Sequence, residues 1–183
     1  MAYTLIDCYT DEPAGLGVPP YLGTYPRYIA GFLDENVNYL TIDDLRLWKK
    51  HNGRIYEPKK SQKTDITTYN LSVNHKNVNE ILQNTDTLIV VLGVHVPGKY
   101  LSAIPGTLHE IIPLIKDLKC KKILTGPAVF GTQLFGGKFY EKADLSAFDK
   151  VSYEMFNFKY GDVKEYSLKG ASIIKQIPDR QLK

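Results

Sequence analysis

The chain has 183 residues, of which 43% are apolar and 23% charged, and these proportions are typical of a soluble globular protein. The length predicts a single domain over residues 1–183, and a formal net charge of +3, spread along the chain, does not predict a nucleic-acid partner. Because no apolar run reaches about 18 residues and no basic start precedes a long apolar stretch, we expect no membrane span and no signal peptide.

The sequence has two cysteines, Cys8 and Cys120, far apart in the chain. Together with the lack of a targeting segment, they predict a cytoplasmic protein with free thiols. Two cysteines are also too few to hold an iron–sulfur cluster within this chain. Thirteen tyrosines are many for this length, and they either line a site or lie scattered and half-buried in the core.

Short apolar runs alternate with amphipathic patterns along the first half of the chain. They predict strands over residues 2–9 and 38–42, and helices over 25–36, 41–53 and 77–84. In the first helix, Ile29, Phe32 and Leu33 are expected on one face. In the second helix, Thr41 and Asp44 have the spacing of an N-terminal capping pair.

The clearest segment is DTLIVVLG at 86–93, a continuous β-branched run typical of a strand buried on both faces of a parallel sheet. It is followed by a predicted helix over 107–118, where Thr107 and Glu110 form a capping box. Another strand is predicted from Cys120, ending at Gly126 and Pro127. Strand, helix and strand at this spacing form a βαβ unit, whose crossover is nearly always right-handed.

The pattern is weaker beyond residue 130. Residues 134–140 are predicted to be a turn, 148–156 a short last strand, and 166–178 an edge hairpin or tail. Taken together, the elements predict an α/β fold with an open, mostly parallel twisted sheet and helices on both of its faces.

Ligands of open parallel sheets bind outside the carboxyl ends of the strands. That rule selects three glycine- and proline-rich loops, at 8–25, 93–106 and 126–133, which we expect to share one rim. We predict a small-molecule ligand there.

The first loop contains Asp7, Cys8, Asp11 and Glu12. Clustered carboxylates bind metals, carry out acid/base work or contact ligand hydroxyls, and the alternative is that Asp11 and Glu12 are turn residues before a proline. Cys8 alternates with Asp7 along the strand and is expected to be a small buried residue.

The same loop continues as GLGVPP, with Gly15 and Gly17 but no third glycine leading into a helix. This spacing does not match a classical dinucleotide fingerprint. The loop instead leads into the N-terminus of a predicted helix near Arg27. This arginine either pairs with an anionic ligand group or is a solvent-exposed charge.

The second loop, GVHVPGKYLSAIPG, contains Gly93, His95, Gly98 and Lys99. A histidine two residues past a buried strand can carry protons or bind a metal, and the alternative is a structural histidine. No second histidine or cysteine stands at metal-ligand spacing, so no metal site is predicted. The third loop begins at Gly126.

Four motifs follow in order: DEPAGLGVPPYLGTYPRYIAG, YLTIDDLR, VVLGVHVPGKYLSAIPGTLHEI and ILTGPAV. They resemble the N-terminal region of a largely archaeal family of radical SAM proteins, over about residues 3 to 131. In that family this region is similar to a cobalamin-binding domain of flavodoxin-like, Rossmann-like topology and precedes the catalytic barrel. The resemblance implies that this chain is a fragment, and that the barrel, its [4Fe-4S] cluster and its S-adenosylmethionine lie beyond Lys183.

The resemblance makes cobalamin a candidate ligand, but the family of cobalamin domains with a histidine axial ligand has Asp-x-His-x-x-Gly after the first strand. Here the stretch is DCYTDE, with Tyr9 in place of the histidine. The serine motif after the middle strand is replaced by GVHVPG, and the double glycine before proline is TGP, keeping Gly126.

Two hypotheses follow. In the first, the chain is an accessory domain of a radical SAM enzyme that binds a cofactor or substrate or shapes substrate access to the barrel. The binding residues would be Asp11, Gly15, Gly17, Arg27, Gly93, His95, Gly98, Lys99 and Gly126. In the second, it is a structural or protein-interaction module with a vestigial pocket. Because no complete catalytic set is visible, catalysis is expected in the barrel rather than here.

Overall fold

The fold was analysed in a computed structural model that describes residues 1–8, 24–50, 78–92, 106–126, 129, 132–133, 140–141, 144–152 and 160–174. Within these residues the elements, in chain order, are β1 (Tyr3–Asp7), α1 (Thr24–Leu33), β2 (Val37–Thr41), α2 (Ile42–Lys50), α3 (Val78–Gln83), β3 (Thr87–Val91), α4 (Leu108–Ile115), β4 (Lys121–Thr125), β5 (Thr132–Gln133), β6 (Tyr140–Glu141), β7 (Lys150–Ser152) and α5 (Tyr160–Ile173).

The described strands form a five-stranded sheet in the order β2-β1-β3-β4-β7, and every neighbouring pair in it is parallel. This is the strand order of flavodoxin-like folds, with β7 in the fifth place. The predicted α/β class is therefore confirmed. β5 and β6 form a separate antiparallel pair that flanks the turn predicted at 134–140.

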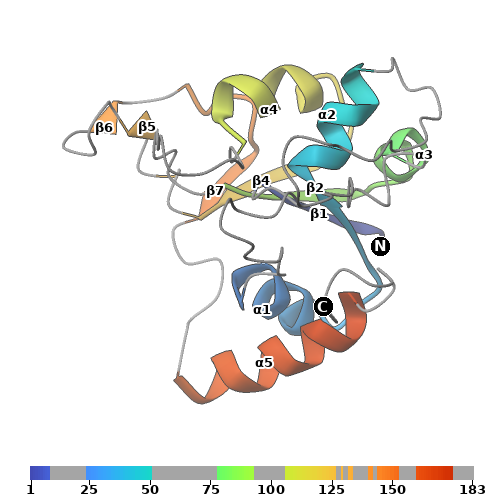
Figure 1. The fold of residues 1–183 in the computed structure, drawn as a ribbon, viewed down its shortest axis with the longest axis vertical. Coiled ribbons are helices and arrows are strands. Elements are labelled where there is room, and N and C mark those ends of the chain that lie inside the picture. Colours follow the sequence, from blue (N-terminus) through green and yellow to red (C-terminus); the bar gives the residue numbers. More distant parts are fainter. Residues whose placement is uncertain are drawn as a thin grey trace, which may run out of the picture.

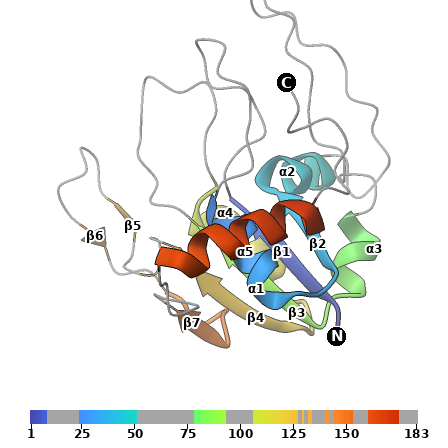
Figure 2. The ribbon, with the colours of Figure 1, turned by 90° about the horizontal axis from the view of Figure 1, so that it is seen from below.

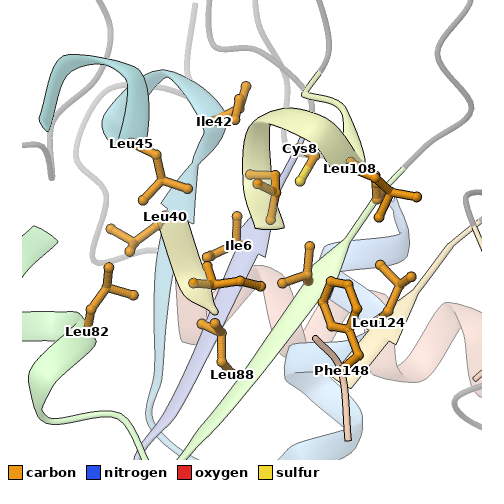
Figure 3. Packing of buried hydrophobic residues seen from close by; sticks show 14 of the residues in the cluster. Ile6, Cys8, Leu40, Ile42, Leu45, Leu82, Leu88, Leu108, Leu124 and Phe148 are labelled. Atoms are coloured by element: carbon orange, nitrogen blue, oxygen red, sulfur yellow. The ribbon is translucent and has the colours of Figure 1, made fainter. Parts of the chain in front are cut away.

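Helices cover both faces of the sheet, as expected (Figure 1). One face carries α2, α3 and α4, whose apolar residues pack with those of the strands around Ile6, Val90 and Leu124. Figure 3 shows this cluster, with Cys8 between Ile42 and Leu108. The other face carries α1, and α5 lies on the outer side of α1 in both views (Figures 1 and 2).

The central strand β3 explains why both faces need cover. All five of its residues are buried, and they alternate between the two apolar clusters, with Leu88 and Val90 on one side and Ile89 and Val91 on the other. A strand in the middle of a parallel sheet has no solvated face, so its sequence is a continuous apolar run rather than an alternating one.

Two predicted helix starts have the expected caps. Thr41 precedes α2, where its amide donates to Asp44 Oδ2 at 2.9 Å and its hydroxyl accepts the Asp44 amide at 3.4 Å. Thr107 precedes α4 and accepts the amide of Glu110 at 3.2 Å. In each case a side chain satisfies an amide that the first helical turn leaves without a partner.

Two expectations for the helices were wrong. Residues 166–178 were predicted to be an edge hairpin or tail, but α5 occupies Tyr160–Ile173. Phe32 was expected on the buried face of α1, but its side chain is exposed and lies against the ring of Tyr166 of α5. Both errors have one cause, which is that α1 and α5 pack on each other and not only on the sheet.

No helix in the described parts of the chain is long and apolar enough to cross a membrane.

The guanidinium of Arg46 on α2 holds both carboxylate oxygens of Glu110 on α4, with Nε–Oε1 at 2.8 Å and Nη2–Oε2 at 3.0 Å. We expect a double-mutant cycle with Arg46→Ala and Glu110→Ala to give a coupling free energy of about 1 kcal/mol, because the pair is bidentate and only partly exposed. Urea unfolding of the four proteins measures it. The coupling free energy should fall at 1 M salt, because salt at that concentration screens charges over about 3 Å. A coupling free energy that does not change with salt would contradict an electrostatic origin.

Candidate functional site

The last residues of the sheet strands lie side by side at its carboxyl edge. The register aligns Thr41 with Asp7, Asp7 with Val91, Val91 with Thr125, and Thr125 with Ser152. All five are buried. In-register residues of a parallel sheet point to the same face, so one row at this edge has four polar residues and a single valine. We call it the strand-end row.

Two tyrosines hydrogen-bond to the strand-end row. The hydroxyl of Tyr39, on β2, donates to Asp7 Oδ2 at 2.7 Å, and this pair is buried. The hydroxyl of Tyr25, in the first turn of α1, lies 2.7 Å from Thr125 Oγ1, and either oxygen can be the donor. The first pair satisfies a carboxylate that would otherwise be costly to bury, and the second attaches the start of α1 to the end of β4.

The row lies at the topological switch point of the fold. From β1 the chain first goes to β2 on one side and later returns to β3 on the other, so the crossovers diverge between β1 and β3. In open parallel sheets this divergence leaves a crevice outside the carboxyl ends of the two strands, which is where such folds bind ligands. Asp7 and Val91, the ends of these two strands, are neighbours there.

Backbone hydrogen bonds fix where the neighbouring segments leave the sheet. The amide of Cys8 donates to Val91 O at 3.0 Å, and that of Leu92 to Thr125 O at 3.0 Å. The amide of Gly106 donates to Cys8 O at 2.7 Å. The described chain therefore leaves the sheet at Cys8 and at Leu92 and returns to it at Gly106, all at the carboxyl edge.

Cys8 lies on the opposite face of the sheet, below the junction of α2 and α4. A Cβ added to Gly106 would be 2.9 Å from Ile42 Cδ1 and 3.2 Å from Cys8 Cβ, so this glycine allows the chain to pass close above the thiol. Burial, with smaller contributions from the carboxylates of Asp7 and Glu110, raises the pKa of the Cys8 thiol well above its usual value, and Arg46 opposes this. The expectation of a small buried residue is confirmed.

Of the predicted site residues, the structure describes Arg27 and Gly126. Gly126 follows Thr125 with φ +96°, and an added Cβ would lie 2.5 Å from Leu92 O. Its backbone conformation and close packing on β3 thus require glycine with or without a ligand. Arg27 is half-buried on α1, and its carbonyl oxygen lies against Gly170 of α5.

The other predicted site residues lie outside the described part of the chain, and their roles stay predictions; they are Asp11, Gly15, Gly17, Gly93, His95, Gly98 and Lys99. In the part of the chain that is described, no group of three or more His, Cys, Asp and Glu residues could hold a metal ion.

Sequence reasoning noted Asp7 but missed the rest of the strand-end row and its two tyrosines. A signal was present, since the runs TLID, NYLT, KILT and KVS each end an apolar segment on a polar residue. Parallel strands that end on polar residues place them together at one edge. The partners Tyr25 and Tyr39 could not be chosen among thirteen tyrosines without the packing of α1 and β2.

Comparison with known proteins finds archaeal relatives. Over 96% of its length the chain is 34% identical to an uncharacterized protein of Methanocaldococcus jannaschii, and over 98% it is 28% identical to an uncharacterized protein of Archaeoglobus fulgidus. The chain spans 32% and 30% of the lengths of these relatives, which is about a third. No protein-family model matches the chain. No solved structure matches it either.

We expect Tyr39→Phe to lower the free energy of unfolding by about 1–3 kcal/mol, because the buried Asp7 carboxylate loses the donor at 2.7 Å while the ring is kept. Urea unfolding at neutral pH measures the loss. Tyr3→Phe is the matched control, since Tyr3 lies at the other end of β1 and is only partly buried. Equal stability of the two variants would contradict a structural role for the pair.

Alkylation should distinguish the two cysteines. The thiolate is the reactive form of a cysteine. Burial raises the pKa of the Cys8 thiol well above its usual value, and it raises the pKa of the Cys120 thiol less. In the native protein at pH 8, iodoacetamide should therefore modify Cys120 first and Cys8 only on unfolding, as read by peptide mass spectrometry. The Cys8 thiol ionises at a lower pH in the unfolded chain than in the native protein. The free energy of unfolding should therefore fall as the pH rises through the usual thiol pKa. Rapid native modification of Cys8 would contradict its burial.

Proposed function

We propose that this chain is an accessory domain that binds a small-molecule cofactor or substrate at the carboxyl edge of its sheet and presents it to the remainder of a longer protein. The observation that carries the proposal is the strand-end row at the switch point between β1 and β3, with Asp7 and Thr125 each paired to a tyrosine. Open parallel sheets bind ligands at this edge, and its row of polar strand ends supplies the polar groups that such a site requires.

The arrangement of the connections supports the same edge. On the side of the amino ends, the chain passes from helix to strand within residues 34–36, 84–86 and 116–120. At the carboxyl edge, residues 9–23 separate Cys8 from α1 and residues 93–105 separate Leu92 from Gly106, while β2 runs directly into α2 there and residues 51–77 separate α2 from α3. Long connections placed on a rigid scaffold commonly carry binding residues. They contain the predicted site residues Asp11, Gly15, Gly17, Gly93, His95, Gly98 and Lys99.

The finer part of the proposal is the kind of protein. The four motifs that resemble the radical SAM family support an accessory role beside a catalytic barrel, and the relatives, about three times as long as this chain, leave room for one. A corrinoid is the ligand that this resemblance favours. With Tyr9 in the position of the axial histidine, it would bind without a histidine from that motif. The radical chemistry, the [4Fe-4S] cluster and S-adenosylmethionine would belong to the remainder of the protein.

Titration of hydroxocobalamin into the purified chain tests the ligand. We expect a saturable change of the corrinoid absorbance spectrum, and a weakening of about fivefold in Tyr25→Phe, which removes one hydroxyl from the carboxyl edge. Tyr3→Phe, at the amino end of β1, is the matched control and should bind as the wild type does.

No spectral change at any corrinoid concentration would overturn the corrinoid assignment. The second hypothesis, an interaction module without a ligand, would then be favoured, because Asp7, Thr41 and Thr125 of the edge already have partners within the domain. Anaerobic expression of the full-length protein, read for corrinoid and iron–sulfur absorbance, tests the radical SAM assignment separately.

A further inference from the structure

The contact between α1 and α5 is closest where a glycine of each helix lies against the backbone of the other. A Cβ added to Gly31 would meet the carbonyl oxygen of Tyr166, and one added to Gly170 would meet the carbonyl oxygen of Arg27, at 1.9 Å and 1.7 Å. Each glycine therefore lies against the backbone of the other helix, and the two contacts are reciprocal. Neither position has room for any side chain.

Aromatic and charged groups extend this contact along both helices. The ring of Tyr166 packs edge-on against Tyr28 at 5.5 Å and against Phe32 at 5.6 Å between ring centroids. At the end of α1, Asp34 pairs with Lys169 on the surface. These contacts lie on either side of the glycine crossing, so they hold α1 and α5 together over several turns.

The contact between α1 and the sheet is of a different kind. Ile29 packs there in an apolar layer with Leu5, Val37 and Ile89. A layer of side chains can accommodate small displacements by changes of rotamer, and such layers are where packed helices slide in shear motions. A backbone-to-backbone contact has no side chains to readjust, so sliding is expected between α1 and the sheet rather than between α1 and α5.

The start of α1 meets the candidate site. Tyr25 lies in its first turn, and the hydroxyl of Tyr25 is 2.7 Å from that of Thr125 in the strand-end row. Arg27, whose carbonyl oxygen touches Gly170, is two residues further along the same helix. A displacement of α5 would therefore reach the carboxyl edge through less than one turn of helix.

We propose that α1 and α5 form one rigid unit that shifts over the sheet, and that this shift makes or breaks the Tyr25–Thr125 contact at the carboxyl edge. The position of α5, on the outside of the domain, is thereby coupled to the edge where the ligand site is proposed (Figure 1). The coupling is a property of the chain alone and does not depend on the identity or existence of a ligand.

Fluorine NMR of protein labelled with 3-fluorotyrosine tests the coupling. The resonances of Tyr25, Tyr166 and Tyr3 are assigned by single Tyr→Phe changes. In Gly170→Ala, which forces α5 away from α1, we expect the Tyr25 resonance to shift or broaden together with that of Tyr166, while Tyr3 at the amino end of β1 stays unchanged. Ser172→Ala, at an exposed position of α5, is the matched control and should move none of them.

A second variant reads the coupling in the opposite direction, since coupling between two positions is reciprocal. Tyr25→Phe removes the contact with Thr125 and should speed amide hydrogen exchange in residues 160–174 by about fivefold, whereas Tyr3→Phe should leave that rate unchanged. This measurement decides the matter if Gly170→Ala does not fold. A folded Gly170→Ala protein with an unmoved Tyr25 resonance, or an unchanged exchange rate of α5 in Tyr25→Phe, overturns the proposal.

Discussion

The burial of β3 on both faces is the constraint on which the rest of this fold depends. A fully buried strand in the middle of a parallel sheet is stable only if both faces are covered, and two separate apolar clusters do this. On one face, three helices share the task. On the other, α1 lies directly on the sheet, so whatever positions α1 also controls how well that face is closed.

The second layer on the α1 face follows from this division of work. α1 is buried on two sides, toward the strands at Ile29 and toward α5 at Tyr28. The outer helix crosses α1 closely, and Gly31 and Gly170 permit this close approach from both sides. Glycine in the middle of a helix costs about 1 kcal/mol relative to alanine, and here the close crossing of the two helices offsets the cost.

The sequence predicted most of the sheet and the starts of two helices, because those features depend on local patterns. The continuous β-branched run at 86–93 predicted β3, and shorter apolar runs predicted its neighbours. The Thr41–Asp44 and Thr107–Glu110 spacings predicted caps that the structure contains. Helix α5 was missed because its apolar residues face another helix across a glycine, so the usual stripe is weak and the segment ASII favours a strand. Phe32 was misplaced because its ring packs against Tyr166 of α5 and not against the sheet.

The candidate site divides in the same way between local and non-local information. The sequence places Asp7 and Thr125 within predicted strands, but that both end their strands and are nearly adjacent depends on the fold, since Val91 alone separates them in the row. Which tyrosine reaches which strand end depends further on how α1 crosses the sheet. The edge is therefore assembled from the sheet and from α1 together, and its chemistry changes with the position of that helix. Because α5 is fixed to α1 and α1 reaches the strand-end row through Tyr25, a change at the surface of α5 is coupled to that buried row.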